Sequence, residues 1–155
     1  MYITCQERDK YDDFELKPVN APSTNIEQSL QLTYKQEKLE AMMDVLKIHL
    51  VNKKEETINL RNKDQSKIMI FCNSRKRCVS IATYILLSFP EINVSTMHGN
   101  MSQSERDFSE NEFRIGNTRI MVCTDVICRG HDSGGVNLVV QYSISNNKSR
   151  RLKQR

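Results

Sequence analysis

A charged loop that contains a glycine follows directly on an apolar run in the second half of the sequence. The run is Ile120–Cys123, and the loop from Thr124 to Asp132 reads Thr-Asp-Val-Ile-Cys-Arg-Gly-His-Asp. Apolar runs of this length are typical of buried strands, and ligands of open α/β sheets bind just beyond the carboxyl ends of strands. We therefore predict that this loop binds a ligand.

Two further apolar runs are followed by polar loops of the same kind. The run 68–72 precedes Asn-Ser-Arg at 73–75, and the run 94–97 precedes His-Gly at 98–99. If the strands are parallel, these loops leave the sheet at one edge, where the following helices direct free N–H groups and positive dipole ends. Hydroxyls and arginines there can bind phosphate oxygens, and Gly99 lets a backbone approach closely. The pattern predicts that these loops bind a sugar-phosphate backbone and do not read the base sequence.

Three helices are predicted between the strands. The first covers about residues 39–50, where apolar residues recur at i, i+3, i+4, i+7 and i+11. The second has an apolar face over 78–89 and ends before Pro90, because proline disfavours a helical residue before it. The third begins at a capping box that starts with Ser102 and ends near Gly116.

Strands are expected over five segments: 26–34, 68–72, 94–97, 119–123 and 137–142. Strands that alternate with helices favour a parallel sheet with right-handed crossovers. The sequence therefore predicts a single three-layer α/β sandwich with a mostly parallel sheet, and its length of 155 residues corresponds to one domain.

The composition, with 38% hydrophobic and 27% charged residues, is that of an ordinary globular protein. The residues after Met1 are polar and charged, and no apolar run of about 18 residues occurs, so neither secretion nor a membrane partner is indicated. We expect an intracellular protein, either cytoplasmic or nuclear. The net charge of +4 comes from residues 146–155, which contain five of the 23 basic residues and no acidic residue. The rest of the chain is nearly neutral, with 18 basic and 19 acidic residues. Such a run either binds a phosphate backbone or is a solvated tail.

Five cysteines occur, at positions 5, 72, 78, 123 and 128, and none forms a Cys-x-x-C pair. In an intracellular protein we interpret them as reduced core thiols. A metal site built from them, or from them with His98, would need shorter ligand spacings, so no metal is predicted.

The segments 68–75 and 94–99, each an apolar run followed by a polar loop, and the loop 124–132 occur in a fixed order with Gln103-x-x-Arg106 and Gly135-Val-x-x-Val-Val-x-Tyr142. This ordered set resembles the carboxyl-terminal RecA-like lobe of DEAD-box RNA helicases. The resemblance covers about residues 24–147. It implies a P-loop NTPase-type sandwich, with a mostly parallel sheet, that is incomplete at its C-terminal end.

The resemblance and the composition also divide the chain. Residues 1–23 end in Ala-Pro-Ser and are interpreted as an inter-lobe linker or flexible tail. Residues 24–147 form the lobe, within which 52–67 is a charged surface insertion. Residues 148–155 form a basic tail.

The resemblance implies that six residues bind the sugar and phosphate groups of RNA: Ser74, Arg75, Gly99, Gln103, Arg106 and Thr124. Each alone has a structural alternative, because Ser74 can be a helix N-cap, Arg106 can form a surface ion pair, and Thr124 can make a strand-end hydrogen bond. His98 is interpreted as a packed, hydrogen-bonded side chain without a role in proton transfer.

The resemblance further implies ATP contacts and a lobe interface at Arg129, Gly130 and Asp132. Asp132 would accept hydrogen bonds from the ribose, and Arg129 would help to secure the closed interface. From the residues alone, Asp132 is equally explained as a turn-forming aspartate.

Several parts of the complete family pattern are absent from the sequence. It contains neither a G-x-x-x-x-G-K-[ST] loop nor an Asp-Glu-Ala-Asp segment, so ATP and its Mg²⁺ would be held by an amino-terminal RecA-like lobe that acts as partner. After Tyr142 the chain also lacks the His-Arg-x-Gly-Arg-x-x-Arg segment of the family. We therefore assign no catalytic residue, and we do not transfer the arginine finger onto Arg150, Arg151 or Arg155. The isolated chain is expected not to hydrolyse ATP and to expose a sheet edge or an apolar face.

The first functional hypothesis is the second lobe of an ATP-dependent RNA helicase that acts on single-stranded or duplex RNA. An alternative is a non-catalytic RNA-binding or regulatory module that keeps the loops and has a basic tail in place of the arginine finger. A third is a superfamily 2 lobe that acts on DNA, which the motifs at 103–106 and 124–132 favour less. Flanking coding sequence would separate the first two hypotheses, and competition between RNA and DNA would test the third.

Overall fold

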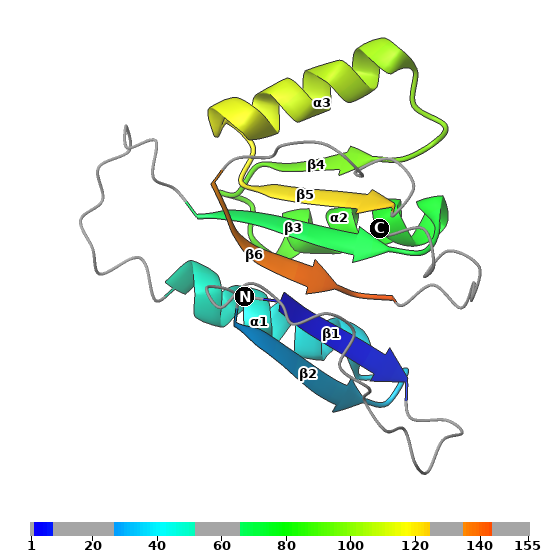
Figure 1. Ribbon diagram of the computed structural model, residues 1–155, viewed down its shortest axis with the longest axis vertical. Coiled ribbons are helices and arrows are strands. Elements are labelled where there is room, and N and C mark those ends of the chain that lie inside the picture. Colours follow the sequence, from blue (N-terminus) through cyan, green and yellow to red (C-terminus); the bar gives the residue numbers. More distant parts are fainter. Residues whose placement is uncertain (1, 8–26, 52–65, 125–134, 144–155) are drawn as a thin grey trace.

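The structure is a computed structural model that describes residues 2–7, 27–51, 66–124 and 135–143. Within these residues six strands form one sheet in the order β2-β1-β6-β3-β5-β4, and all neighbouring strands are parallel (Figure 1). The parallel sheet that the sequence predicts is confirmed. The strands are β1 (Tyr2–Glu7), β2 (Gln28–Thr33), β3 (Lys67–Cys72), β4 (Val94–Met97), β5 (Ile120–Thr124) and β6 (Val136–Gln141).

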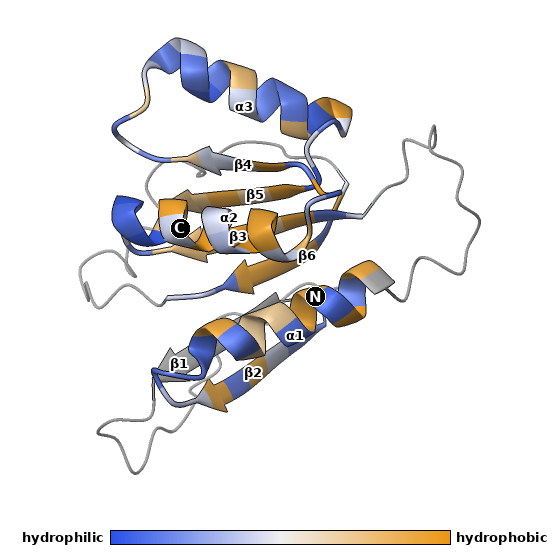
Figure 2. Cartoon of the chain, turned by 180° about the vertical axis from the view of Figure 1, so that it is seen from behind, coloured by the Kyte–Doolittle hydropathy of each residue, from blue (hydrophilic) through white to orange (hydrophobic). Residues whose placement is uncertain are grey.

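The three predicted helices are α1 (Lys38–Val51), α2 (Arg75–Ser88) and α3 (Gln103–Ile115). Helices α1 and α2 pack on one face of the sheet (Figure 2), whereas α3 places Phe113 against the other face. The arrangement is the three-layer α/β sandwich of a RecA-like lobe. In the described part of the chain, no helix is both long enough and apolar enough to cross a membrane.

The central strands divide their side chains between two cores, because successive residues of a strand point to opposite faces. In β3, Ile68 and Ile70 pack with α1 and α2, whereas Met69 packs in the core that contains Phe113. β5 is divided in the same way. A strand that is covered on both faces needs apolar residues throughout, which is why β3 and β5 are apolar in sequence without a break.

The ends of α2 and α3 are fixed by local hydrogen bonds. Ser74 caps α2 and accepts a hydrogen bond from the Arg77 backbone N–H at 3.4 Å. Ser102 begins α3 in a complete capping box with Glu105, and Gly116 ends it in the left-handed region at φ 88°. The helix boundaries predicted from Ser102 and Gly116 are therefore confirmed.

Residues 2–7 differ from the prediction that 1–23 are an inter-lobe linker or flexible tail. They form β1, which pairs with both β2 and β6 and so lies inside the sheet. Tyr, Ile and Thr in this segment favour strands, but the segment has no continuous apolar run of the kind that marks β3 and β5, and the prediction rested on the charged and proline-containing sequence that follows. Residues 8–26 lie outside the described residues.

The charged insertion predicted over 52–67 also needs a correction at its end. Lys67 is the first residue of β3 and is buried. Its ammonium donates to the Arg114 carbonyl oxygen at 2.7 Å and lies 5.7 Å from the centre of the Phe113 ring. A buried charged group is tolerated where it is hydrogen-bonded. Residues 52–65 and the predicted basic tail at 148–155 lie outside the described residues.

The outer strand β2 and the residue that follows it expose three large apolar side chains. Leu30, Leu32 and Tyr34 are 44%, 55% and 54% exposed. The register places Leu30 level with Gln141 across β1, on the sheet face opposite α1. An exposed apolar stripe at a sheet edge of this kind is a surface that favours association.

Candidate nucleic-acid interface

The carboxyl ends of the neighbouring strands β3, β5 and β4 lie at one edge of the sheet. The registers place the end of β3 opposite Thr124 and the end of β4 opposite Cys123. Ser74 and Gly99 each follow two residues after their strand. The structure thus brings Ser74, Gly99 and Thr124 to one edge, as the parallel arrangement predicts. We call this edge the rim and define it by Ser74, Arg75, Gly99, Gln103, Arg106 and Thr124.

The first rim loop leads from β3 into α2. Ser74 and Arg75 are both exposed. The oxygen of Ser74 accepts the Arg77 N–H, and since a hydroxyl has one donor and two acceptor positions, its proton is available to a ligand oxygen. The Cys72 thiol donates to the Ser74 carbonyl oxygen at 3.6 Å and to that of Cys123 at 3.4 Å. These contacts tie the loop to the neighbouring strand.

The second rim loop leads from β4 into α3. A tight turn closes with a hydrogen bond from the Met101 N–H to the His98 carbonyl oxygen at 3.1 Å, and it leaves Gly99 exposed. The Ser102 backbone N–H and hydroxyl donate to Glu105 at 2.7 and 2.8 Å. Both hydrogen bonds lower the pKa of the Glu105 carboxyl, and the nearby His98 lowers it slightly further. The loop is therefore held by an ionised carboxylate at neutral pH.

The first turn of α3 presents two further rim residues, Gln103 and Arg106. Gln103 is exposed and donates to Asp107 at 2.6 Å, so a ligand would have to compete for its amide. Arg106 is partly buried, and its Nε has no hydrogen-bond partner within the described residues; the same is true of His98 Nδ1. The hydrogen-bonded state expected for His98 is therefore not seen at this nitrogen. Buried donors without a partner are uncommon, and Arg106 can still donate to an anion.

The first turn of α2 carries three basic residues, of which the sequence interpretation included only Arg75 in the site. Arg75, Lys76 and Arg77 are consecutive, and no acidic residue lies in this turn. Cations at a helix N-terminus oppose the helix dipole, whereas an anion there is favourable. The three basic residues directly after an N-cap serine are the sequence signal that could have identified Lys76 and Arg77.

The remaining predicted contacts lie outside the described residues. These are Arg129, Gly130 and Asp132. Within the described residues, no group of three or more His, Cys, Asp or Glu side chains could hold a metal ion. The buried cysteines Cys72, Cys78 and Cys123 are free thiols, and Cys78 donates to the Val122 carbonyl oxygen at 3.1 Å.

Comparison with known proteins gives matches to helicases. The model of the helicase conserved C-terminal domain family matches residues 38–155. ATP-dependent RNA helicase DBP2 of Candida glabrata is 43% identical over 84 residues, which cover 54% of this chain and 15% of the relative. ATP-dependent RNA helicase fal1 of Schizosaccharomyces pombe is 39% identical over 85 residues, which cover 54% of this chain and 21% of the relative. The crystal structure of the Pyrococcus furiosus Hef helicase domain is similar with a TM-score of 0.57 and 26% identity, over 74% of this chain and 22% of that chain.

The chain spans about a fifth or less of the length of these curated relatives. Their names and the family match confirm the resemblance to the carboxyl-terminal lobe of DEAD-box RNA helicases. The match covers most of the chain, and the sheet has helices on both faces as a RecA-like lobe requires. The chain therefore belongs to the helicase conserved C-terminal domain family.

Proposed function

We propose that the chain acts as the second lobe of an ATP-dependent RNA helicase and binds the backbone of single-stranded RNA at the rim. The observation that supports this most is that the loops after β3 and β4 and the end of β5 lie at one edge of the sheet. Curated relatives over the same region are named ATP-dependent RNA helicases. Together they favour RNA as the ligand of the rim.

The chemistry of the rim suits phosphate and sugar rather than bases. The positive end of α2, the Ser74 hydroxyl and Arg75 can bind one phosphate group. Arg106 can donate its unpaired Nε to another anion. Gly99 is exposed and lets the RNA backbone approach the turn. Thr124, at the end of β5, can offer its hydroxyl between these two groups.

A direct test compares two arginines of α3. Arg106 belongs to the rim, whereas Arg114 lies two turns further on, is exposed and donates to Asn111 at 2.9 Å. Loss of one phosphate contact should reduce the slope of log affinity against log salt by roughly 1. We therefore expect R106A to weaken binding of a fluorescent single-stranded oligouridine and to lower its salt slope, and R114A to leave both nearly unchanged. Equal losses in the two variants would contradict the rim as the RNA site.

The ATP-dependent part of the proposal concerns residues beyond the described ones. We propose that Arg129, Gly130 and Asp132 contribute to the ATP site at the lobe interface, and that Mg²⁺ is held by the amino-terminal lobe. Since the sequence offers no matching arginine finger, and such a finger contributes about 10³ to 10⁵ in rate in related systems, the chain alone should not hydrolyse ATP. Phosphate release from ATP is the assay, and RNA-stimulated turnover by the purified chain would refute this.

A second candidate function is a non-catalytic RNA-binding or regulatory module. It is suggested by the five basic residues in 146–155, because a basic run can bind the phosphate backbone of RNA. This module would bind RNA at the rim but would give no ATP hydrolysis even when an amino-terminal helicase lobe is supplied in trans, whereas the helicase lobe would restore turnover. Competition with single-stranded DNA of the same base sequence tests the preference for RNA.

A further inference from the structure

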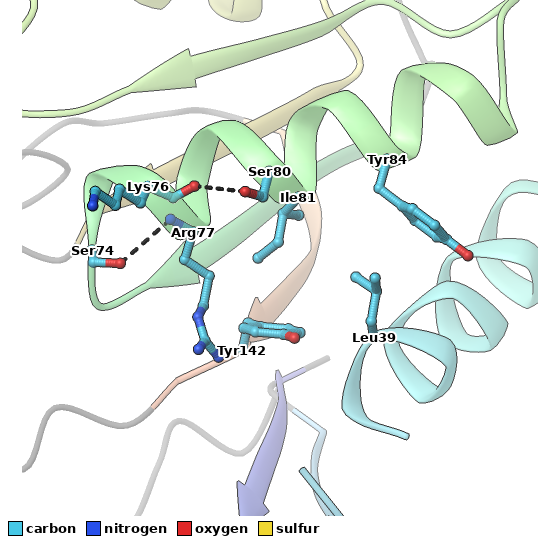
Figure 3. Close-up of a pocket in the computed structure, with 8 residues that line it drawn as sticks. All are labelled: Leu39, Ser74, Lys76, Arg77, Ser80, Ile81, Tyr84 and Tyr142. Carbon is cyan, nitrogen blue, oxygen red and sulfur yellow. Dashed lines mark hydrogen bonds between the residues drawn. The ribbon is translucent and has the colours of Figure 1, made fainter. Parts of the chain in front are cut away.

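A pocket of about 520 Å³ lies between α1 and α2, beside the end of β6 (Figure 3). None of the functional roles above accounts for it, although it shares Ser74 with the rim. Its volume is within the range of about 300 to 1,000 Å³ that is usual for ligand sites. The described residues that line it are Leu39, Ser74, Lys76, Arg77, Ser80, Ile81, Tyr84 and Tyr142.

One end of the pocket is basic. Lys76 and Arg77 line it, and no lining residue is acidic. The Arg77 guanidinium carbon lies 5.7 Å from the centre of the Tyr142 ring, and the Lys38 ammonium lies 5.1 Å from it. Tyr142 is only 6% exposed. The cation–π contact between Arg77 and Tyr142 therefore packs the Arg77 side chain against a buried ring (Figure 3). The N-terminal end of α2 adds its positive dipole.

The other end of the pocket is apolar. Leu39 from the first turn of α1 and Ile81 from α2 form this part together with Tyr84. Tyr84 is 41% exposed, and Leu87, one turn further along the same side of α2, is 77% exposed. From Ser74 to Tyr84 the helix rises by about 15 Å. The pocket therefore changes from basic to apolar along α2, away from the rim.

We infer that this pocket docks an acidic segment of a partner protein. Carboxylates of the segment would face Lys76 and Arg77, and an apolar side chain would lie between Leu39, Ile81 and Tyr84. Charge complementarity selects an acidic occupant, and an aliphatic side chain of a peptide can fill the apolar end of the pocket, which lies away from the rim. The inference does not depend on RNA binding at the rim.

The test uses three probes with the full chain. The first is a short fluorescent peptide rich in Asp and Glu with a central Leu, the second has Ser in place of that Leu, and the third is a single-stranded oligouridine. The first peptide should bind and should shift the backbone amide NMR signals of residues 74–84. The second should bind at least about fivefold more weakly, since it lacks the apolar anchor.

Matched variants locate the contact. K76E reverses a pocket charge, and K47E reverses an exposed charge on α1 that pairs with Asp44 outside the pocket. Y84S removes a pocket side chain that is 41% exposed, and L86S removes one that is 43% exposed on the other side of α2. We expect K76E and Y84S each to weaken peptide binding about five- to tenfold, and K47E and L86S to change it less than about twofold.

Four outcomes would overturn the inference. They are no peptide binding up to about 1 mM, equal affinity of the Leu and Ser peptides, equal effects of the pocket and control variants, and oligouridine that shifts the signal of Tyr84 as strongly as the peptide does. The last outcome would make the pocket part of the RNA path. A thermal melt of each variant confirms that it is folded, so lost binding reports on the pocket itself.

Discussion

Replacement of Phe113 by alanine should separate α3 from the sheet more effectively than any other single change in that helix. Phe113 is 1% exposed, and the only other buried residue of α3 is Ser109. A buried Phe→Ala substitution costs about 3 to 5 kcal/mol, and the loss of the ring under the Lys67 ammonium, 5.7 Å away, should add up to about 1 kcal/mol. A typical domain has a free energy of unfolding of about 5 to 15 kcal/mol, so F113A should remove a large fraction of it.

The helix offers its own control, because Phe108 has the same side chain but is 68% exposed. F108A should change the free energy of unfolding by less than about 0.5 kcal/mol. Urea unfolding followed by circular dichroism measures both variants. Since α3 carries Gln103 and Arg106, F113A should also weaken RNA binding, whereas F108A should not. Similar unfolding free energies for F113A and F108A would refute the packing of α3 through Phe113.

Three further predictions concern the ends of α3. S102A removes the capping box and should cost about 1 kcal/mol of stability in urea unfolding, while S104A, which removes only the hydrogen bond between the Ser104 and Ser102 hydroxyls at 3.1 Å and leaves the capping box in place, should cost less. Because the pKa of Glu105 is lowered in the folded state, its carboxylate stabilises the fold above its unfolded pKa of about 4.3, and this stabilisation is lost as pH falls through the folded pKa. The stability difference between the wild type and E105Q should therefore be constant from pH 7 down to about pH 5 and shrink below about pH 4; a difference that grows at low pH would contradict this. G116A should cost about 1 to 2 kcal/mol through its positive φ, since a Cβ there meets no atom within 4 Å, and G116N should cost less.

The sequence predicted the central part of the fold because several signals agree there. β3 and β5 are buried on both faces, and their continuous apolar runs mark them without ambiguity. The boundaries of α3 follow from Ser102 and Gly116, whose side-chain and backbone chemistry act locally. Helix-end signals of this kind depend on residues close together in sequence, so they indicate the helix boundaries in any tertiary context.

The parts that were not predicted depend on contacts that are remote in sequence. β1 pairs with β2 on one side and with β6 on the other, and its six residues form no continuous apolar run that would indicate a strand inside the sheet. The buried Lys67 donates a hydrogen bond to the Arg114 carbonyl oxygen, 47 residues away, and nothing near Lys67 in the sequence indicates this partner. The pocket between α1 and α2 likewise joins Leu39 to Tyr142, and no motif connects positions so far apart.

Stability and ligand binding are separable in most of this lobe but are coupled at the start of α3. A parallel sheet brings its strand-to-helix loops to one edge whatever residues those loops contain, so Arg75 and Arg106 can be changed without loss of core packing. Ser102 and Glu105 are different, because their hydrogen bonds shape the turn that presents Gly99 and also begin the helix that carries Arg106. Changes at this capping box should therefore reduce stability and RNA binding together, and their two effects should not be additive with R106A, since residues that share one local network couple energetically.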